Sequence, residues 1–263
     1  MNEDSDSIRY ETGGDGVATL WLNRPDKRNS IHVEMLHAMN ARLSLIERDP
    51  ALHVLVIRGA GGNFCGGGDL ESAVDPSVSA VPSEYQRMLA ALFNRIQNFL
   101  KPTVAVVEGY ATGGGLELML ACDFAIAADD AWIGDYHVNR ALVAGCGLLY
   151  RLPRVLGLRK AKELVLTGKL LSGRECAEWG LVNSAAPADM LESEVEALCR
   201  TLAGKSSLCM QITKLALNQS MDAGSDMLAL VETLTVNLMN QSADTQEGIA
   251  AFLEKRSPQW KGR

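Results

Sequence analysis

The first half of the chain alternates short apolar segments with amphipathic ones. Segments rich in Val, Leu and Ile and bounded by Gly, Pro and Asn predict strands, at residues 17–22, 53–58, 103–107 and 124–127. Between the first two, apolar side chains recur near every 3.6 residues over 32–48, which predicts an amphipathic helix. Further helices are predicted at about 84–100 and from Glu117 onward. This alternation predicts an α/β layer fold.

The pattern changes after Gly147, where helical periodicity dominates. Short helices are predicted at 148–156, 158–167 and 172–179, and longer ones at 187–203, 206–223, 225–240 and 244–255. Residues 75–83 (DPSVSAVPS) are expected to form a flexible loop, and no repeat of 20–50 residues is found. We therefore expect an α/β core over residues 1–195 and a helical region over 196–263.

Composition restricts the class of protein. The chain has 263 residues, 47% of them hydrophobic, and a net charge of −7, so a globular fold is expected and a nucleic-acid partner is not. The sequence contains no run of 18 apolar residues, so no membrane span is predicted. The acidic, polar beginning does not resemble a signal peptide, so a cytoplasmic location is expected.

The cysteines and histidines do not suggest a metal centre. Six cysteines are present without CxxC spacing, and four histidines form no metal-type cluster. Most of the cysteines lie in apolar runs, where free Cys acts as a small core residue. Neither a disulfide framework nor a metal site is expected.

Two glycine runs carry the first hint of chemistry. Gly66–Gly68 follows one predicted strand, and Gly113–Gly115 precedes an apolar helix that carries Glu117 near its start. Backbone N–H groups without side chains can approach a ligand closely, and a helix N-terminus favours negative charge. Two such turns could hold one anionic oxygen atom; each could also be a simple turn or packing point. Glu117 is either a first-turn acid favoured by the helix dipole or an enclosed carboxylate suited to acid–base chemistry.

Five segments, in order along the chain, resemble the enoyl-CoA hydratase/isomerase (crotonase) family. They are "LNRPDKRNSI" (22–31), "NFCGGGDL" (63–70), "GYATGGGLELMLACDFAIA" (109–127), "LPRVLGLRKAKELVLTGKLLSGRECAEWGLVN" (152–183) and "FLEKRSPQW" (252–260). The resemblance implies a crotonase-like spiral of repeated ββα units. It also implies that the helical C-terminal region mediates oligomerisation, as a homotrimer or a dimer of trimers (hexamer).

The resemblance also implies an activity. Family members bind acyl-CoA thioesters and stabilise a thioester enolate with two backbone N–H groups, which fall here on Gly68 and Gly114. Glu117 matches the first catalytic glutamate of the hydratases, which activates the water added across the α,β double bond. The expected activity is that of an enoyl-CoA hydratase, a lyase of the EC 4.2.1.17 type used in fatty acid metabolism among other pathways. Coenzyme A is then part of the substrate and no separate cofactor is expected.

The sequence departs from the hydratase pattern at one catalytic position. A second glutamate is expected 20 residues after the first, within "G-x-P-E", but His137 stands there and Tyr136 replaces the proline. His137 could act as general acid or base in place of the glutamate, or it could be a packed neutral residue. Asp135 could supply a carboxylate or orient His137, or it could be a turn residue. In the family, double-bond isomerisation depends on the second glutamate, which is absent here, so isomerase activity is disfavoured.

Coenzyme A contacts are transferred with less detail. The matching residues are Lys27, Arg28, Ser30, Gly66, Gly67, Asp69 and Leu70. Lys27 and Arg28 would suit phosphates, although a solvated surface pair is the alternative. Glu71 stands where many relatives have lysine, so one basic contact is missing. Phe252 and Lys255 match residues that in relatives approach CoA, often from a neighbouring subunit; simple helix packing would also explain Phe252.

The acyl pocket and the reaction type remain open. The pocket is expected to be lined by residues 75–92 and those after His137, with the candidates Met88, Leu89, Leu92, Val143 and Leu148. Cys146 invites an interpretation as a nucleophile, but no partner base stands at a recognisable spacing. Besides a hydratase, the residues allow a thioester or C–C hydrolase or a decarboxylase on the same fold, and a non-catalytic binding protein.

Overall fold

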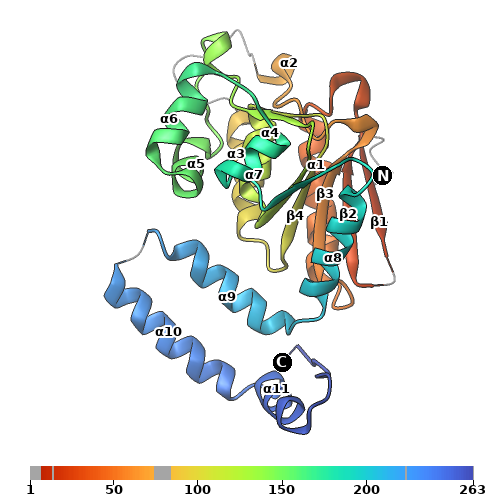
Figure 1. The fold of residues 1–263 in the computed structure, drawn as a ribbon, viewed down its shortest axis with the longest axis vertical. Coiled ribbons are helices and arrows are strands. Elements are labelled where there is room, and N and C mark those ends of the chain that lie inside the picture. Colours follow the sequence, from red (N-terminus) through yellow and green to blue (C-terminus); the bar gives the residue numbers. More distant parts are fainter. Residues whose placement is uncertain (1–6, 14, 74–83, 223, 263) are drawn as a thin grey trace.

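A six-stranded sheet runs through the molecule and contains the strands that the sequence predicts (Figure 1). The computed structural model describes residues 7–13, 15–73, 84–222 and 224–262. The strand order is β1-β2-β3-β4-β6-β9, with β1 antiparallel to β2 and all other pairs parallel. The strands are β1 (Ile8–Thr12), β2 (Val17–Leu22), β3 (Val54–Gly59), β4 (Thr103–Val107), β6 (Phe124–Ala128) and β9 (Ser184–Ala186).

Helices cover both faces of this sheet (Figure 1). Helix α1 packs against β1 and β2, and its apolar side chains are buried as the sequence pattern predicts. Helix α8 packs against β3, β6 and β9. The helices of the core are α1 (Val33–Arg48), α2 (Leu70–Ala73), α3 (Glu84–Gln97), α4 (Gly114–Ala121), α5 (Leu148–Leu156), α6 (Leu158–Thr167), α7 (Gly173–Trp179) and α8 (Leu191–Ala203).

A second, smaller sheet positions the candidate site. It has the order β5-β7-β8, with β5 (Tyr110–Thr112) parallel to β7 (Trp132–Gly134) and β7 antiparallel to β8 (Leu171–Ser172). These strands have only two or three residues, too few for a hydrophobic period, and the sequence pattern did not predict them. Because β5 and β7 are parallel, the segments that follow them emerge at the same edge.

Three helices extend from one end of the core (Figure 1). They are α9 (Ser207–Gln219), α10 (Ser225–Asn240) and α11 (Ala243–Glu254). Polar contacts tie α9 to the core: Lys214 Nζ lies 2.7 Å from Asp123 Oδ2, and the Asn218 amide donates to the carbonyl of Gln97 over 2.8 Å. The division of the chain at residue 195 remains a prediction.

Some sequence predictions are corrected or lie outside the described residues. The helix expected from Glu117 onward begins earlier, at Gly114, because the glycine turn itself forms its first residues. The helix expected over 187–203 begins at Leu191. The expected loop at 75–83 falls outside the described residues. Within the described ranges, none of the helices has the length and apolar character that crossing a membrane requires.

Candidate active site

The two glycine turns lie side by side at the edge of the small sheet. Parallel bridges pair Ile31 with Gly68 and Cys65 with Ala111. The N–H of Cys65 donates to the carbonyl of Tyr110 over 2.9 Å, and the N–H of Thr112 donates to the carbonyl of Cys65 over 3.1 Å. The segment that ends in Gly66–Gly68 therefore runs alongside β5, which leads directly into Gly113–Gly115.

The backbones of these turns touch, so side chains are excluded between them. A Cβ added to Gly114 would lie 2.9 Å from the nitrogen of Gly68, and one on Gly67 would lie 3.0 Å from the carbonyl oxygen of Thr112. Gly67 and Gly113 have φ angles of +115° and +55°, which favour glycine. The structure thus brings Gly68 and Gly114 together.

The N–H groups of both residues have no acceptor among the described residues. No described residue accepts a hydrogen bond from the N–H of Gly68. Gly114 is the first residue of α4, and the first N–H groups of a helix have no acceptor within it. Two neighbouring donors without protein acceptors form a plausible oxyanion-binding backbone.

Glu117 lies one turn into α4 and is 1% exposed. Its Oε1 accepts hydrogen bonds from the N–H of Cys146 over 2.7 Å and from that of Leu148 over 3.3 Å. Burial raises the pKa of Glu117, opposed by the Cys146 hydrogen bond and by the nearby His137. A buried carboxylate with a raised pKa is a better proton acceptor near neutral pH than a solvated one.

His137 follows β7 and is oriented by Asp135. Its Nδ1 lies 2.5 Å from Oδ1 of Asp135, whose side chain is 1% exposed. Burial lowers the pKa of His137, but the hydrogen bond and charge of Asp135, together with the charge of Glu117, outweigh it and raise the pKa overall. Of the two interpretations of Asp135, the geometry supports orientation of the histidine over a surface turn.

The imidazole lies directly against the second glycine turn. A Cβ added to Gly113 would lie 3.4 Å from Cε1 and 3.6 Å from Nε2 of His137. The N–H of Gly113 donates to the carbonyl of Gly134 over 3.2 Å, which locks the end of β7 onto the turn. His137 therefore lies beside Gly113, the residue before Gly114, with its side chain only partly buried.

The segment matched to coenzyme A binding lies next to the first glycine turn. Lys27 and Arg28 are exposed, and neither forms an ion pair with a described carboxylate. The Arg28 guanidinium stacks over the ring of Tyr110 at 4.7 Å, and its carbonyl accepts from the N–H of Gly66 over 2.7 Å. Ser30 is half-buried, and its carbonyl accepts from Arg24 Nη1 over 2.8 Å.

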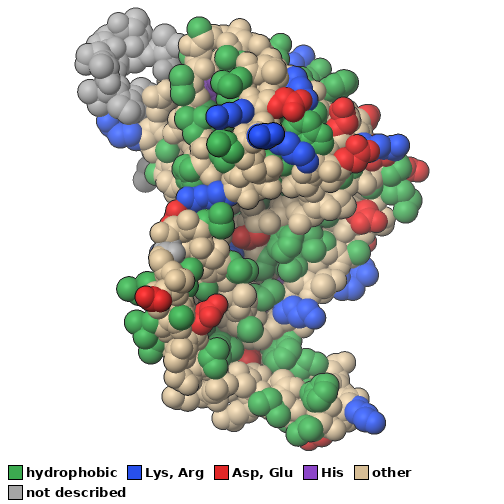
Figure 2. All heavy atoms as spheres, turned by 60° about the vertical axis from the view of Figure 1, so that its left-hand side comes forward, with side chains coloured by type: hydrophobic (Ala, Val, Ile, Leu, Met, Phe, Trp, Pro, Cys, Tyr) green, Lys and Arg blue, Asp and Glu red, His purple; other side chains and the backbone are tan. Residues whose placement is uncertain are grey.

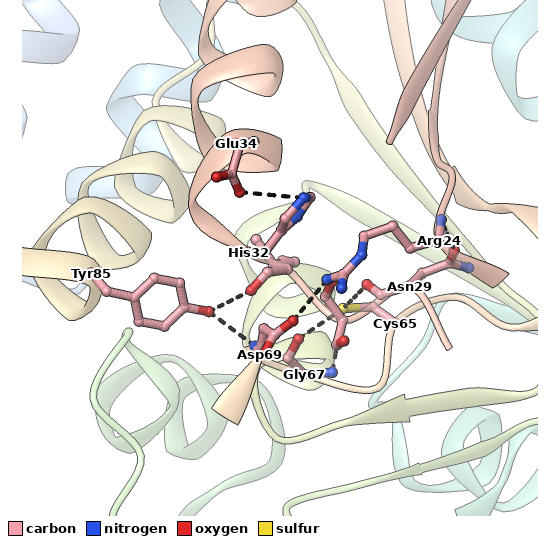
Figure 3. A network of polar contacts seen from close by, with 10 residues as sticks. Arg24, Asn29, His32, Glu34, Cys65, Gly67, Asp69 and Tyr85 are labelled. Atoms are coloured by element: carbon pink, nitrogen blue, oxygen red, sulfur yellow. Dashed lines mark hydrogen bonds and ion pairs between the residues drawn. The ribbon is translucent and has the colours of Figure 1, made fainter. Parts of the chain in front are cut away.

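The side chain of Asp69 is held by the protein itself (Figure 3). Its Oδ2 lies 2.9 Å from Nη1 of Arg24. The hydroxyl of Tyr85 donates to the carbonyl of Ile31 over 2.6 Å and accepts from the N–H of Asp69 over 3.2 Å. This network fixes the backbone on the far side of Gly68, so a contact of Asp69 with CoA remains a prediction.

Three predicted binding residues lie at the surface. Leu70 begins α2, next to the first glycine turn, and is half exposed. Phe252 is 82% exposed on α11, and Lys255 ends that helix. Figure 1 shows α11 at the opposite end of the molecule from α2 and α4. Within one chain the structure does not bring Phe252 or Lys255 to the glycine turns.

The candidate acyl-pocket residues separate into two groups. Leu89, Leu92 and Leu148 are buried in the core, and Met88 packs against it. Val143 is exposed. Cys146 is buried, and burial together with the charge of Glu117 raises its pKa to about 12, which keeps it a thiol and argues against a nucleophile.

Two further residues near the site were missed by the sequence analysis. Tyr85 holds the first glycine turn from α3, and Arg151 contacts the loop that holds Glu117. Both occupy helix positions within apolar periodicity, Tyr85 near the start of its helix and Arg151 inside the predicted helix at 148–156. A charged residue at a core-facing position was the available signal for Arg151.

The fold and the site geometry are those of an α/β protein in which two glycine turns lie beside a buried carboxylate and a partly buried histidine paired with an aspartate. The description "enoyl-CoA hydratase/isomerase" matches residues 12–263, and the chain belongs to this family. It is 35% identical to the human mitochondrial enoyl-CoA hydratase domain-containing protein 2, over 97% of this chain and 89% of that protein. It is also 35% identical to 1,2-epoxyphenylacetyl-CoA isomerase of Escherichia coli, over 94% of this chain and 96% of that protein.

A solved structure shares the whole architecture. The enoyl-CoA hydratase of Bacillus anthracis superposes with a TM-score of 0.91 at 30% identity, over 98% of this chain and 100% of that one. The fold is therefore the crotonase fold with a helical C-terminal region, as the resemblance implied.

Proposed function

We infer that the protein is an acyl-CoA-processing lyase that adds water to a 2-enoyl-CoA. The observation that carries this inference is the contact between the Gly68 and Gly114 backbones beside the buried Glu117 and the partly buried His137, which pairs with Asp135. The family membership supports the thioester substrate.

The proposed reaction assigns one step to each group. Glu117 accepts a proton from a water molecule, and the water oxygen forms a bond to Cβ of the enoyl group. The displaced π electron pair moves to the thioester oxygen, where the N–H groups of Gly68 and Gly114 stabilise the negative charge. The imidazolium of His137 then donates a proton to Cα, and the enolate returns to a thioester. Proton exchange with solvent restores both side chains.

The pKa directions fit this division of labour. A raised pKa makes Glu117 a stronger base, and a raised pKa keeps His137 protonated to higher pH. Asp135 holds Nδ1–H, so that Nε2 carries the proton that is transferred. Proton transfer and charge stabilisation thereby act on one substrate, which explains a carboxylate placed directly behind a glycine turn.

We propose that Lys27 and Arg28 bind the phosphates of coenzyme A, which enters as part of the substrate. Both are exposed near Gly66, and neither is neutralised by a described carboxylate. Gly67 and the backbone of Asp69 and Leu70 would then lie along the pantetheine arm. The reaction as written uses no metal and no separate cofactor.

Glu117→Gln tests the reaction type. The variant keeps the shape of the side chain but cannot accept the proton, so hydration of crotonyl-CoA should fall by about 10²- to 10⁴-fold. Glu34→Gln, which makes the same change on an exposed side chain of α1, is the matched control and should retain wild-type activity. Loss of enoyl absorbance and release of free CoA thiol are followed in parallel.

The parallel thiol assay separates the alternatives. A His–Asp pair beside a carboxylate could also activate water for attack on the thioester itself, which would make the protein a CoA-thioester hydrolase. Free thiol release without hydration would favour that hydrolase, and carbon dioxide release from a carboxyacyl-CoA would favour a decarboxylase. Binding of acyl-CoA without any turnover would indicate a non-catalytic member.

We propose that the protein assembles as a homotrimer or a dimer of trimers. Helices α10 and α11 expose large apolar side chains, and Figure 2 shows hydrophobic side chains at the surface of the lower part of the molecule. A groove of about 470 Å³ between α9 and α10 is lined mainly by apolar side chains, among them Ile212, Leu215, Met227 and Val231. A neighbouring subunit would cover these surfaces and bring Phe252 and Lys255 to another chain's site. Analytical ultracentrifugation would give the mass.

A cytoplasmic location is likewise a proposal. It is supported by the six cysteines, all of which are free thiols, as expected in a reducing compartment. The name of the human relative places that protein in mitochondria, so fractionation of the source cells is the deciding measurement.

A further inference from the structure

Arg151 is a buried cation on α5. Its residue is 4% exposed, and its guanidinium donates to three neutral oxygen atoms. The acceptors are the carbonyl of Cys146 at 2.8 Å, Oδ1 of Asn94 at 2.7 Å and Oε1 of Gln97 at 2.8 Å. Among the described residues no Asp or Glu lies within ion-pair distance of it. Burying a guanidinium that no carboxylate contacts directly is costly, so a structural role is expected for it.

The same loop links Arg151 to Glu117. Cys146 donates through its N–H to the Glu117 carboxylate and accepts through its carbonyl from Arg151. Between Cys146 and α5 stands Gly147, with a φ of +112°. A Cβ at Gly147 would lie 1.9 Å from Nη1 of Arg151, so the guanidinium packs on a backbone that only glycine leaves free.

We propose that Arg151 is a positioning residue that clamps the Cys146–Leu148 loop, so that its N–H groups hold the catalytic carboxylate of Glu117 in place. The inference rests on the proposed role of Glu117 as the base. Asn94 and Gln97 anchor the guanidinium to α3, and one rigid unit then joins α3, the loop, α5 and the start of α4. Glu117 has its own direct contacts to the loop, and Arg151 acts through them.

The charged and titratable groups around Glu117 set the expected sign. Facing it are His137 and Asp135 after β7, and Cys146 and Arg151 from the loop and α5. Arg151 is the fixed positive charge among them, and the loop it holds supplies both N–H donors. Loss of Arg151 weakens the donors and removes the cation. Both changes disfavour the ionised carboxylate and move its titration to higher pH.

Three variants test this inference. Arg151→Gln removes the positive charge and the several N–H donors of the guanidinium, and Arg151→Lys keeps the charge. Arg154→Gln removes a neighbouring arginine of α5 that pairs with Asp222 at the surface and serves as the matched control. For Arg151→Gln we expect kcat for crotonyl-CoA hydration to fall about 10- to 100-fold with KM changed less than about threefold. The acidic limb of the kcat profile should move to higher pH. Arg151→Lys should restore the limb but only part of kcat, and Arg154→Gln should match wild type.

The titration of Glu117 is measured independently of turnover. Carbon-13 NMR of glutamate carboxyl groups, with Glu117→Gln to assign the signal, should show the higher titration point in Arg151→Gln and not in Arg154→Gln. This readout still tests the clamp if wild type hydrates no enoyl-CoA, an outcome that would contradict only the proposed function. If Arg151→Gln fails to fold, the double variant Asn94→Ala, Gln97→Leu loosens the guanidinium from α3 and should move the titration in the same direction. Wild-type titration and kcat in the folded Arg151 or α3 variants would overturn the inference.

Discussion

The glycine-turn site buries charged side chains, whereas the C-terminal helices expose large apolar ones. At the site, the carboxyl groups of Glu117 and Asp135 are buried at 1% exposure. On α10 and α11, large apolar side chains lie in the open, with Phe252 at 82% exposure. Buried carboxylates and exposed apolar patches both cost free energy in an isolated chain. This contrast fits the two proposals made above, that a substrate completes one region and a second subunit completes the other.

The two regions also differ in whether their polar groups find hydrogen-bond partners within the chain. Each buried carboxylate has a donor within reach: backbone N–H groups for Glu117 and an imidazole for Asp135. The open N–H groups of the glycine turns are the part left for a ligand. On the C-terminal helices, exposed apolar side chains lack a covering surface. A protein surface can cover them, whereas a CoA ester cannot.

Among substitutions that leave Glu117 and His137 in place, the largest loss of activity is expected where the two glycine turns touch. In Gly114→Ala the new Cβ would lie 2.9 Å from the nitrogen of Gly68 and push the donors apart, so hydration should fall about 10²- to 10³-fold. Gly224→Ala is the control, because a Cβ at Gly224, just before α10, meets nothing within 4 Å. Steady-state kinetics of both variants, with thermal unfolding to confirm the fold, provides the measurement. Equal activity of the two variants would contradict a role of the glycine turns in the reaction.

A smaller effect is expected at Asp135. Asp135→Asn keeps the shape but removes the negative charge that raises the pKa of His137, so that pKa falls. Activity that needs the imidazolium is lost as pH rises through this pKa, so the basic limb of the kcat profile should move to lower pH. The kcat maximum should drop about tenfold, less than the roughly 10²- to 10⁴-fold expected for His137→Gln. An unchanged basic limb would mean that His137 is not the proton donor.

A substitution on the C-terminal helices is expected to change subunit assembly. Phe252→Ser should weaken subunit assembly about tenfold or more, because a large exposed aromatic ring is a typical interface anchor. Leu166→Ser, on an exposed position of α6, is the control and should leave the mass unchanged. Sedimentation velocity over a concentration series reports both. A monomeric wild type would contradict the proposed assembly and leave the active-site proposal intact.

The smallest effect is expected at the surface near the site. Lys27→Ala should raise KM for crotonyl-CoA about two- to fivefold with little change in kcat, because an exposed phosphate contact contributes little and is screened by salt. The difference from wild type should shrink at high ionic strength. A comparable change in Lys162→Ala, an exposed lysine on α6, would show that the effect is general electrostatics.

The sequence predicted the parts of the site that lie in local motifs. The glycine runs, Glu117 and the substitution at His137 could be read directly, because each belongs to a short contiguous segment. Strands β2, β3, β4 and β6 were predicted from their short apolar segments, and helix α1 from its hydrophobic period; these predictions are confirmed, whereas β1 and β9 were not predicted.

Other parts depend on contacts that no local pattern encodes. The hydrogen bond between Asp135 and His137 depends on the turn after β7, and β5, β7 and β8 are too short to show a period. The clamp on the Cys146–Leu148 loop needs α3 and α5 to pack together, which spacing along the chain does not reveal. The separation of α11, which carries Phe252, from α4 is likewise seen only in the fold (Figure 1).

A crystal structure with a bound, non-reacting acyl-CoA would test the shared role of the two turns most directly. We predict that the thioester oxygen lies about 2.7–3.1 Å from the nitrogens of both Gly68 and Gly114, with Glu117 and His137 beside the Cα–Cβ bond. A thioester held elsewhere, with either N–H turned away from its oxygen, would contradict the proposed site.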